Sequence, residues 1–196
     1  MSAVRLLVVV TMLAIAAPAA AASLYITNTK SDSVSIIDTT TLEVTGTIKL
    51  GAGKPNRIVF HPDGKTLYAG AGENKAVLKI DTATQKQVAS IAVPGVVHET
   101  TLTLDGKHLY VTLRKANKIV VVNTADDKIV KILDSKGYPD LVTMEPTGRY
   151  ALVTNRHDNA VSVIDVATLK EIRRIKVGIY PHGMALRPED GRRAAR

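Results

Sequence analysis

The sequence predicts an all-β fold made of repeated four-stranded units, because three sets of residues recur every 42 or 43 positions. The first set begins a short apolar run in each unit: Leu24-Tyr25, Leu67-Tyr68, Leu109-Tyr110 and Ala151-Leu152. The second set ends the following run: Asp38, Asp81, Asn123 and Asp165. The third set marks a hairpin turn: Asp63-Gly64, Asp105-Gly106, Thr147-Gly148 and Asp190-Gly191. Three sets in one register establish an internal repeat whose units start near residues 24, 67, 109 and 151.

Each unit contains four short runs with the composition of strands. In the first unit, residues 24–28 are followed by a polar turn and a β-branched run at 34–37. That run ends at Asp38, whose side chain can cap a tight turn. A third run spans residues 44–50, and a loop containing Gly and Pro leads to a fourth at 57–60. No segment shows helical periodicity over more than one turn.

Four strands in a unit of about 40 residues are typical of a β-propeller blade. We predict about four antiparallel blades over residues 23–191, starting in mid-blade and ending with a lone inner strand at 184–186. Either this last strand pairs with residues 24–28 and closes a small ring, or the propeller is an open, truncated arc, which we favour. An open arc exposes sheet edges that invite pairing with a second copy, so an edge-paired homodimer is a further expectation.

Residues 1–22 are interpreted as a signal peptide rather than as part of the fold. Arg5 precedes an apolar stretch that is too short to span a bilayer, and alanines follow Pro18 up to Ala22. We therefore expect a periplasmic or secreted protein with no transmembrane span after processing. Residues 192–196 form a short basic tail.

The composition excludes several chemistries. The chain of 196 residues has no cysteine, which excludes disulfides, iron–sulfur clusters, c-type haem attachment and thiol catalysis. It has no glycine-rich phosphate loop opening a helix, no G-x-S-x-G elbow and no H-E-x-x-H helix. No catalytic residue and no cofactor are predicted.

One repeat position varies in chemistry while the others keep a structural role. The residues that begin the inner strand of each blade are Asn56, His98, Asp140 and His182, spaced 42 apart. We expect them at the mouth of the central channel, as solvated residues released from packing, with Arg57, Tyr138 and Tyr180 beside them. They are the predicted ligand-binding residues. Glu99 would complete a set of metal-ligating side chains, but no metal site is predicted.

The loops on the same face carry an excess of positive charge. The predicted basic face comprises Arg114, Lys115, Lys118 and Arg156. The formal net charge of the chain is +8. Such a face favours an anionic partner, whereas nucleic acid is a weak possibility because few aromatic side chains are free to stack on bases.

The fourth unit resembles a known repeat. The motifs Leu152-Val153-Thr154-Asn155, Asp158-Asn159-Ala160-Val161 and Pro181-His182-Gly183 resemble the YVTN β-propeller repeat. This resemblance implies a surface-layer-like, non-enzymatic module that binds a ligand, protein or polymer through its loop face. The alternative is the propeller component of a periplasmic oxidoreductase, since the repeat is also similar to the propellers of quinoprotein amine dehydrogenases and to the haem d1 domain of nitrite reductases. A lactonase-like hydrolase is disfavoured because such propellers have seven blades.

Overall fold

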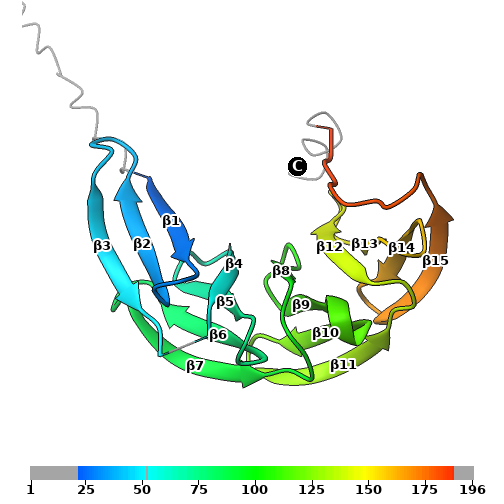
Figure 1. The fold of residues 1–196 in the computed structure, drawn as a ribbon, viewed down its shortest axis with the longest axis horizontal. Coiled ribbons are helices and arrows are strands. Elements are labelled where there is room, and N and C mark those ends of the chain that lie inside the picture. The colour runs from blue at the N-terminus through cyan, green and yellow to red at the C-terminus, as the bar shows by residue number, and fades with distance from the viewer. Residues whose placement is uncertain (1–21, 52, 188–196) are drawn as a thin grey trace, which may run out of the picture.

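The computed structural model describes residues 22–51 and 53–187, whose strands form an open arc (Figure 1). These residues form fifteen strands, arranged as one three-stranded and three four-stranded sheets with antiparallel neighbours. The all-β propeller with about four blades is confirmed, and of the two predicted arrangements the structure has the open arc. Within the described part of the chain, no helix has the length and apolarity needed to cross a membrane.

The four sheets follow one another along the chain as blades 1 to 4. Blade 1 contains β1 (Ser23–Asn28), β2 (Ser33–Asp38) and β3 (Val44–Lys49). Blade 2 contains β4 (Pro55–Phe60), β5 (Thr66–Ala71), β6 (Ala76–Asp81) and β7 (Lys86–Ala92). Blade 3 contains β8 (Glu99–Leu102), β9 (His108–Leu113), β10 (Lys118–Asn123) and β11 (Lys128–Asp134), with the short 3-10 helix η1 (Arg114–Ala116). Blade 4 contains β12 (Pro139–Met144), β13 (Tyr150–Asn155), β14 (Ala160–Asp165) and β15 (Lys170–Lys176).

The inner strand predicted at residues 184–186 is not formed, which corrects that expectation. Residues 181–187 contain no strand. The prediction failed because a strand needs a neighbour to complete its hydrogen-bond ladder, and β1 lies at the other end of the arc (Figure 1). The predicted signal peptide, apart from Ala22, and the basic tail lie outside the described residues.

Apolar clusters between successive blades form the core. Blade 1 contributes Val34 and Ile36 to the first cluster, and blade 2 contributes Leu67 and Ala69. Comparable clusters join blades 2 and 3 and blades 3 and 4. Alternate residues of a strand point to opposite faces of its sheet, so each inner blade packs on both of its neighbours.

The repeated polar residues act in turns, as the sequence predicts. The Asp81 carboxylate accepts hydrogen bonds from the backbone N–H and the hydroxyl of Thr84, at 2.7 and 2.8 Å. Asp38 and Asp165 accept equivalent backbone hydrogen bonds. In every blade, a β-bulge interrupts the pairing of the two outermost strands at the same repeat position. The blades are therefore near-copies, so differences between them are informative.

Candidate functional site

The predicted residues Asn56, His98 and Asp140 lie at or next to the start of the inner strands β4, β8 and β12, and His182 holds the equivalent repeat position in a segment without a strand. A threonine in each of three blades holds the backbone carbonyl of the site residue that follows that blade. Thr27 donates to Asn56 at 3.0 Å, Thr112 to Asp140 at 2.7 Å and Thr154 to His182 at 3.3 Å. The hydroxyl therefore fixes where β4 and β12 begin, and it holds His182 at the equivalent repeat position. These residues and the loops around them lie on one side of the arc, here called the loop face.

Asp140 is the centre of the site, and it is fully buried. This corrects the expectation of a solvated residue at this position. One of its carboxylate oxygens contacts the Arg114 guanidinium and lies 2.5 Å from Nε2 of His98. The other lies 3.2 Å from Nε of Arg156 and 3.8 Å from Nε2 of His182. A buried carboxylate needs such partners, because leaving a charge unpaired in the interior costs several kcal/mol, on the order of 3–5.

The two arginines reach Asp140 from equivalent positions in neighbouring blades. Each is the first residue of the loop between the second and third strands of its blade, Arg114 in blade 3 and Arg156 in blade 4. In blade 1 the equivalent residue, Thr29, also reaches the next inner strand, since its hydroxyl donates to the Pro55 carbonyl at 2.8 Å. Two guanidinium groups thus face one carboxylate, so the cluster keeps an excess of one positive charge when its histidines are neutral.

The environment shifts the pKa of two neighbouring groups in opposite directions. Burial lowers the pKa of His98, the positive charge of Arg114 adds to this effect, and the Asp140 carboxylate opposes it. Burial raises the pKa of Glu99, against the effects of a hydrogen bond from the Thr100 backbone N–H and of the Arg57 charge. Nε of Arg57 lies 3.4 Å from the Glu99 carboxylate. The site therefore favours neutral His98 next to the Arg114 guanidinium.

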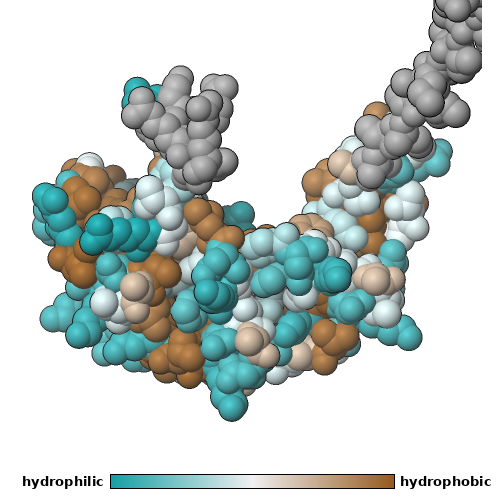
Figure 2. Space-filling model, turned by 180° about the vertical axis from the view of Figure 1, so that it is seen from behind, coloured by the Kyte–Doolittle hydropathy of each residue, from teal (hydrophilic) through white to brown (hydrophobic). Residues whose placement is uncertain are grey.

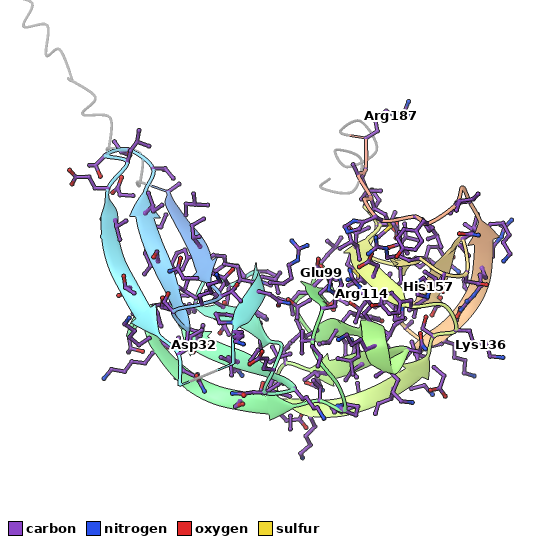
Figure 3. The ribbon with its side chains drawn as sticks, viewed as in Figure 1. Asp32, Glu99, Arg114, Lys136, His157 and Arg187 are labelled. Atoms are coloured by element: carbon purple, nitrogen blue, oxygen red, sulfur yellow. The ribbon has the colours of Figure 1, made fainter. Side chains whose placement is uncertain are left out.

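A stack of aromatic rings lies beside this cluster. His157 is stacked on Tyr138 at a centroid distance of 4.4 Å and an interplanar angle of 14°, and on Tyr180 at 5.7 Å and 29°. The Arg114 guanidinium lies over Tyr138 at 5.3 Å and that of Arg156 over Tyr180 at 4.2 Å. In Figure 3, Arg114 and His157 lie on the same part of the arc as Glu99. His157 is not among the predicted site residues, since nothing in the repeat marks that position.

The two tyrosines of the stack are held in an unusual backbone conformation. Tyr138 and Tyr180 have positive φ angles of 66° and 61°, which are rare for bulky residues. Their backbone N–H groups donate to the side chains of Asn117 and Asn159, each at 2.8 Å. Lys54 occupies the same position after blade 1 and donates to Asp32. Such local strain persists only where surrounding contacts enforce it, and it fixes the tyrosines at the loop face.

The repeat departs from its pattern at blade 2. Gly70 replaces the threonine that elsewhere holds the next inner strand, and Gly72 stands where blades 3 and 4 have arginine. Lys75 replaces the Asp or Asn that receives the backbone N–H. A Cβ at Gly70 would lie 2.7 Å from the Val97 side chain, so glycine is required for this close approach.

A pocket of about 150 Å³ opens at this departure from the repeat. It is lined by Asn56, Val96, Val97, His98, Arg114, Lys115 and Tyr138. Five of the predicted site and basic residues therefore line this one pocket: Asn56, His98, Arg114, Lys115 and Tyr138. Tyr180 and His182 do not line this pocket; His182 lies near the other carboxylate oxygen of Asp140, and Tyr180 lies under the Arg156 guanidinium. The Asn56 amide donates to the Val97 carbonyl at 3.3 Å, which ties blade 2 to the pocket wall.

The predicted basic face is only partly available to a partner. Arg114 and Arg156 turn inward to Asp140, and Lys118 pairs with Asp134 at 2.7 Å. Lys115 is exposed and lines the pocket. Within residues 22–51 and 53–187, no group of three or more His, Asp or Glu side chains is arranged to hold a metal ion.

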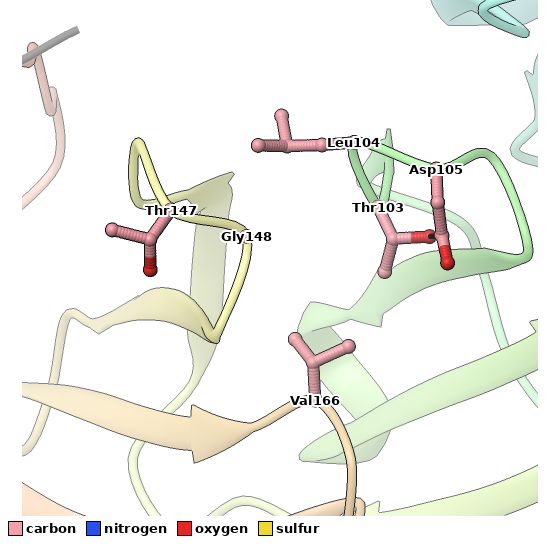
Figure 4. A pocket seen from close by; sticks show the side chains of 6 residues that line it. All are labelled: Thr103, Leu104, Asp105, Thr147, Gly148 and Val166. Carbon is pink, nitrogen blue, oxygen red and sulfur yellow. Dashed lines mark hydrogen bonds between the residues drawn. The ribbon is translucent and has the colours of Figure 1, made fainter. Parts of the chain in front are cut away.

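A second pocket, of about 170 Å³, lies between the turns of blades 3 and 4 (Figure 4). Thr103, Leu104 and Asp105 from the β8–β9 turn face Gly148 of the β12–β13 turn across it. Val166 of the β14–β15 turn also lines it, and these turns join the ends of the strands that lie away from the loop face. Its lining has one carboxylate and no cationic or histidine side chain. The pocket beside Asp140 is therefore the stronger candidate for ligand binding.

Known structures share the fold of this chain. It is similar to hydrazine synthase of Kuenenia stuttgartiensis, at 26% identity and a TM-score of 0.73, over 78% of this chain and 45% of that one. It is also similar to the dihydro-heme d1 dehydrogenase NirN, at 18% identity and a TM-score of 0.68, over 82% of this chain and 36% of that one. A functionally unknown protein from Desulfotomaculum acetoxidans has 16% identity and a TM-score of 0.75, over 85% of this chain and 56% of that one. The chain thus spans only about half, or less, of the length of these structures.

The comparison with protein families is more specific. No curated protein sequence matches the chain significantly. Residues 24–178 match the family described as "Lactonase, 7-bladed beta-propeller". The propeller fold implied by the YVTN resemblance is confirmed, whereas the family that matches is the one whose activity the sequence analysis disfavoured. Because the match covers most of the chain, this protein belongs to the lactonase family of seven-bladed β-propellers.

Proposed function

We propose that this protein is an exported, non-enzymatic propeller module that binds an anionic ligand or partner at the pocket beside Asp140. The observation that carries this proposal is the convergence of Arg114 and Arg156 on one buried carboxylate. Exposed Lys115 adds a further positive charge at the pocket rim. Arginine and lysine side chains are the usual partners of carboxylate and phosphate groups.

The pocket also offers groups that would orient such a ligand. Asn56 and His98 line it with hydrogen-bonding atoms, and Tyr138 adds an aromatic side chain to the wall. Its volume of about 150 Å³ is small, which favours a compact acid or a single acidic group of a larger partner. The periplasmic or secreted location rests on residues 1–22 and is part of the proposal.

Calorimetric titration with two probes tests the proposal: gluconate, a hydroxycarboxylate, and inorganic phosphate. Binding of either probe should weaken as salt rises, since exposed charges are screened. The Lys115→Gln variant should bind at least threefold more weakly, because it removes a pocket-lining charge that has no hydrogen-bond or ion-pair partner among the described residues. Lys131→Gln makes the same chemical change on the outer strand β11 and should leave affinity unchanged.

Two results would contradict the proposal. The first is an absence of binding to both probes at millimolar concentration. The second is hydrolysis of gluconolactone by the purified protein, faster than the spontaneous reaction and reduced in His98→Ala. That result would assign the pocket a lactonase activity, as the family description suggests.

A second candidate is the propeller component of a periplasmic oxidoreductase. The observation that favours it is the similarity to hydrazine synthase at 26% identity. In such a protein, His182 would be the residue that meets a cofactor at the loop face, because its side chain is about half accessible. An absorption spectrum of the protein purified from its native cells separates the two functions. A visible band lost in His182→Ala would support the oxidoreductase, and a spectrum without one would favour the binding module.

A further inference from the structure

The pocket beside Asp140 has a cationic part and an apolar part, and we propose that its ligand is a short aliphatic monocarboxylate. The carboxylate lies against Arg114 and Lys115, and the hydrocarbon chain occupies the space left free by the absence of a side chain at Gly72. This inference rests on the proposed function and names the ligand class of that site. It also makes Gly72 a residue that determines specificity.

Three positions of the repeat form a plug at the loop face between blades 3 and 4. The Arg114 guanidinium lies over the Tyr138 ring, 5.3 Å from its centroid, and contacts the Asp140 carboxylate. The first two of these residues recur one repeat later, where Arg156 lies 4.2 Å from the Tyr180 centroid. An arginine from one blade therefore fills the space in front of the aromatic ring that follows that blade. This arrangement is here called the interblade plug.

The interblade plug is missing between blades 2 and 3. Counted back by 42 residues, its arginine, tyrosine and aspartate are replaced by Gly72, Val96 and His98. One junction therefore lacks a guanidinium group, a phenol ring and a carboxylate at the same time. The pocket of about 150 Å³ is at this junction, because Val96 and His98 both line it. Protein interiors are otherwise closely packed, so the replaced side chains account for the open space.

The backbone at Gly72 could carry a side chain, so its conformation does not require glycine. Its φ angle is not positive. A Cβ at this position would have Cγ1 of Val96 and the Val97 carbonyl oxygen as its nearest neighbours, both at 3.7 Å, which is an ordinary van der Waals distance. Gly70 differs, because a Cβ there would lie 2.7 Å from the Val97 side chain. Glycine at position 72 therefore leaves space in front of Val96 instead of relieving a clash.

The lining of the pocket matches the two ends of an amphipathic acid. Arg114 and Lys115 supply positive charge, and Nε of Arg114 is buried without a hydrogen-bond partner among the described residues. A buried donor of this kind is costly unless an acceptor reaches it, and a carboxylate supplies one. Val96, which is 41% exposed, and buried Val97 supply the apolar part. None of the described residues that line the pocket is a carboxylate, so a cationic ligand would find no partner there.

The missing arginine also sets the length of the hydrocarbon chain. The stem of an arginine side chain consists of three methylene groups, so the space at Gly72 suits a chain of about three carbon atoms. On the face of the molecule shown in Figure 2, hydrophobic residues are interspersed with hydrophilic ones. Such a surface suits a small apolar group better than an extended apolar partner. Butyrate, a carboxylate on a chain of three carbon atoms, is therefore the probe of choice.

Titration of the isotope-labelled protein with acetate, propionate, butyrate and gluconate, followed by NMR, tests this ligand class. Affinity should rise about fourfold with each methylene from acetate to butyrate, because each one leaves water for the apolar wall. The backbone amide signals of Gly72, Val96 and Lys115 should shift. Gluconate carries the same carboxylate on a hydroxylated chain, and it should bind more weakly than butyrate because its hydroxyl groups lose water against Val96.

Substitutions at the junction test the role of Gly72. Gly72→Met fills the space with an uncharged, flexible side chain, and it should weaken butyrate binding about tenfold or more because the hydrocarbon chain loses its place. Gly51→Met is the matched control: Gly51 is exposed, a Cβ there would meet nothing within 4 Å, and butyrate affinity should stay unchanged. Val96→Thr exchanges a methyl for a hydroxyl group. It should lower butyrate affinity about threefold and leave acetate affinity unchanged.

The outcomes separate this inference from the proposed function. Equal affinities for acetate and butyrate, tighter binding of gluconate than of butyrate, or unchanged butyrate binding in folded Gly72→Met would each overturn the ligand class while leaving anion binding at the pocket intact. If Gly72→Met does not fold, the Val96→Thr result decides, and an unchanged ratio of butyrate to acetate affinity overturns the inference. An absence of binding by all four carboxylates and by phosphate would overturn the proposed function and this inference together.

Discussion

Replacing Asp140 by Asn removes the negative charge at the centre of the site and keeps the shape of the side chain. Asp140 is fully buried, while the side chains of Arg114 and Arg156 are about one-fifth exposed. Removing one partner of a buried ion pair costs about 3–5 kcal/mol. Because water can reach both guanidinium groups and the amide oxygen still accepts a hydrogen bond, we expect about 2–3 kcal/mol here.

Urea unfolding measures this effect. With a typical slope of about 2 kcal/mol/M, Asp140→Asn should lower the midpoint by about 1–1.5 M without changing the slope. Asp134→Asn removes an exposed carboxylate that pairs with Lys118, and it should leave the midpoint unchanged. A midpoint for Asp140→Asn equal to that of the unmodified protein would refute the view that this carboxylate holds the two arginines in place.

The other predictions concern the contacts around the site. Thr112→Val removes the hydrogen bond to the Asp140 carbonyl without changing side-chain volume much, and should lower the unfolding free energy by about 1–2 kcal/mol in urea. Asn117→Gly keeps the positive φ of 52° but loses the side-chain acceptor for the Tyr138 backbone N–H, so it should lower the unfolding free energy by about 0.5–1 kcal/mol. An unchanged urea midpoint would show that the turn holds without this hydrogen bond. The lowered pKa of His98 means that the unfolded chain binds its proton more readily. Stability should therefore fall as pH drops from 6.5 toward the folded pKa, and His98→Gln should show less of this fall in thermal melts at each pH.

The repeat spacing predicted most of the fold because the residues that recur every 42 or 43 positions make the same contacts in most blades. Asp81 caps the same kind of turn as Asp38, and the threonines at 27, 112 and 154 hold equivalent carbonyls. The same arithmetic placed His98 and Asp140 at the start of neighbouring inner strands, and their side chains meet. Position along a repeat is thus readable from sequence, since it depends on local turns and strand lengths.

The burial of Asp140 was not readable in this way, because it depends on side chains from two other loops. Arg114 and Arg156 were interpreted as a solvent-facing basic surface, but one buried carboxylate attracts both of them. The pocket could have been found by asking where the repeat loses its usual residues. Gly70 and Gly72 replace side chains that elsewhere hold the next blade, and the pocket opens beside that junction.

The β-bulges described above protect the outer rim of the arc from aggregation. A bulge bends the outermost strand away from a straight template, and the rim also carries charged residues such as Lys128, Lys131, Arg173 and Lys176. Bulges and edge charges are the two common means by which natural sheets prevent strands of other molecules from adding to them. Addition of further strands is therefore disfavoured along β3, β7, β11 and β15, the outermost strands of the four blades.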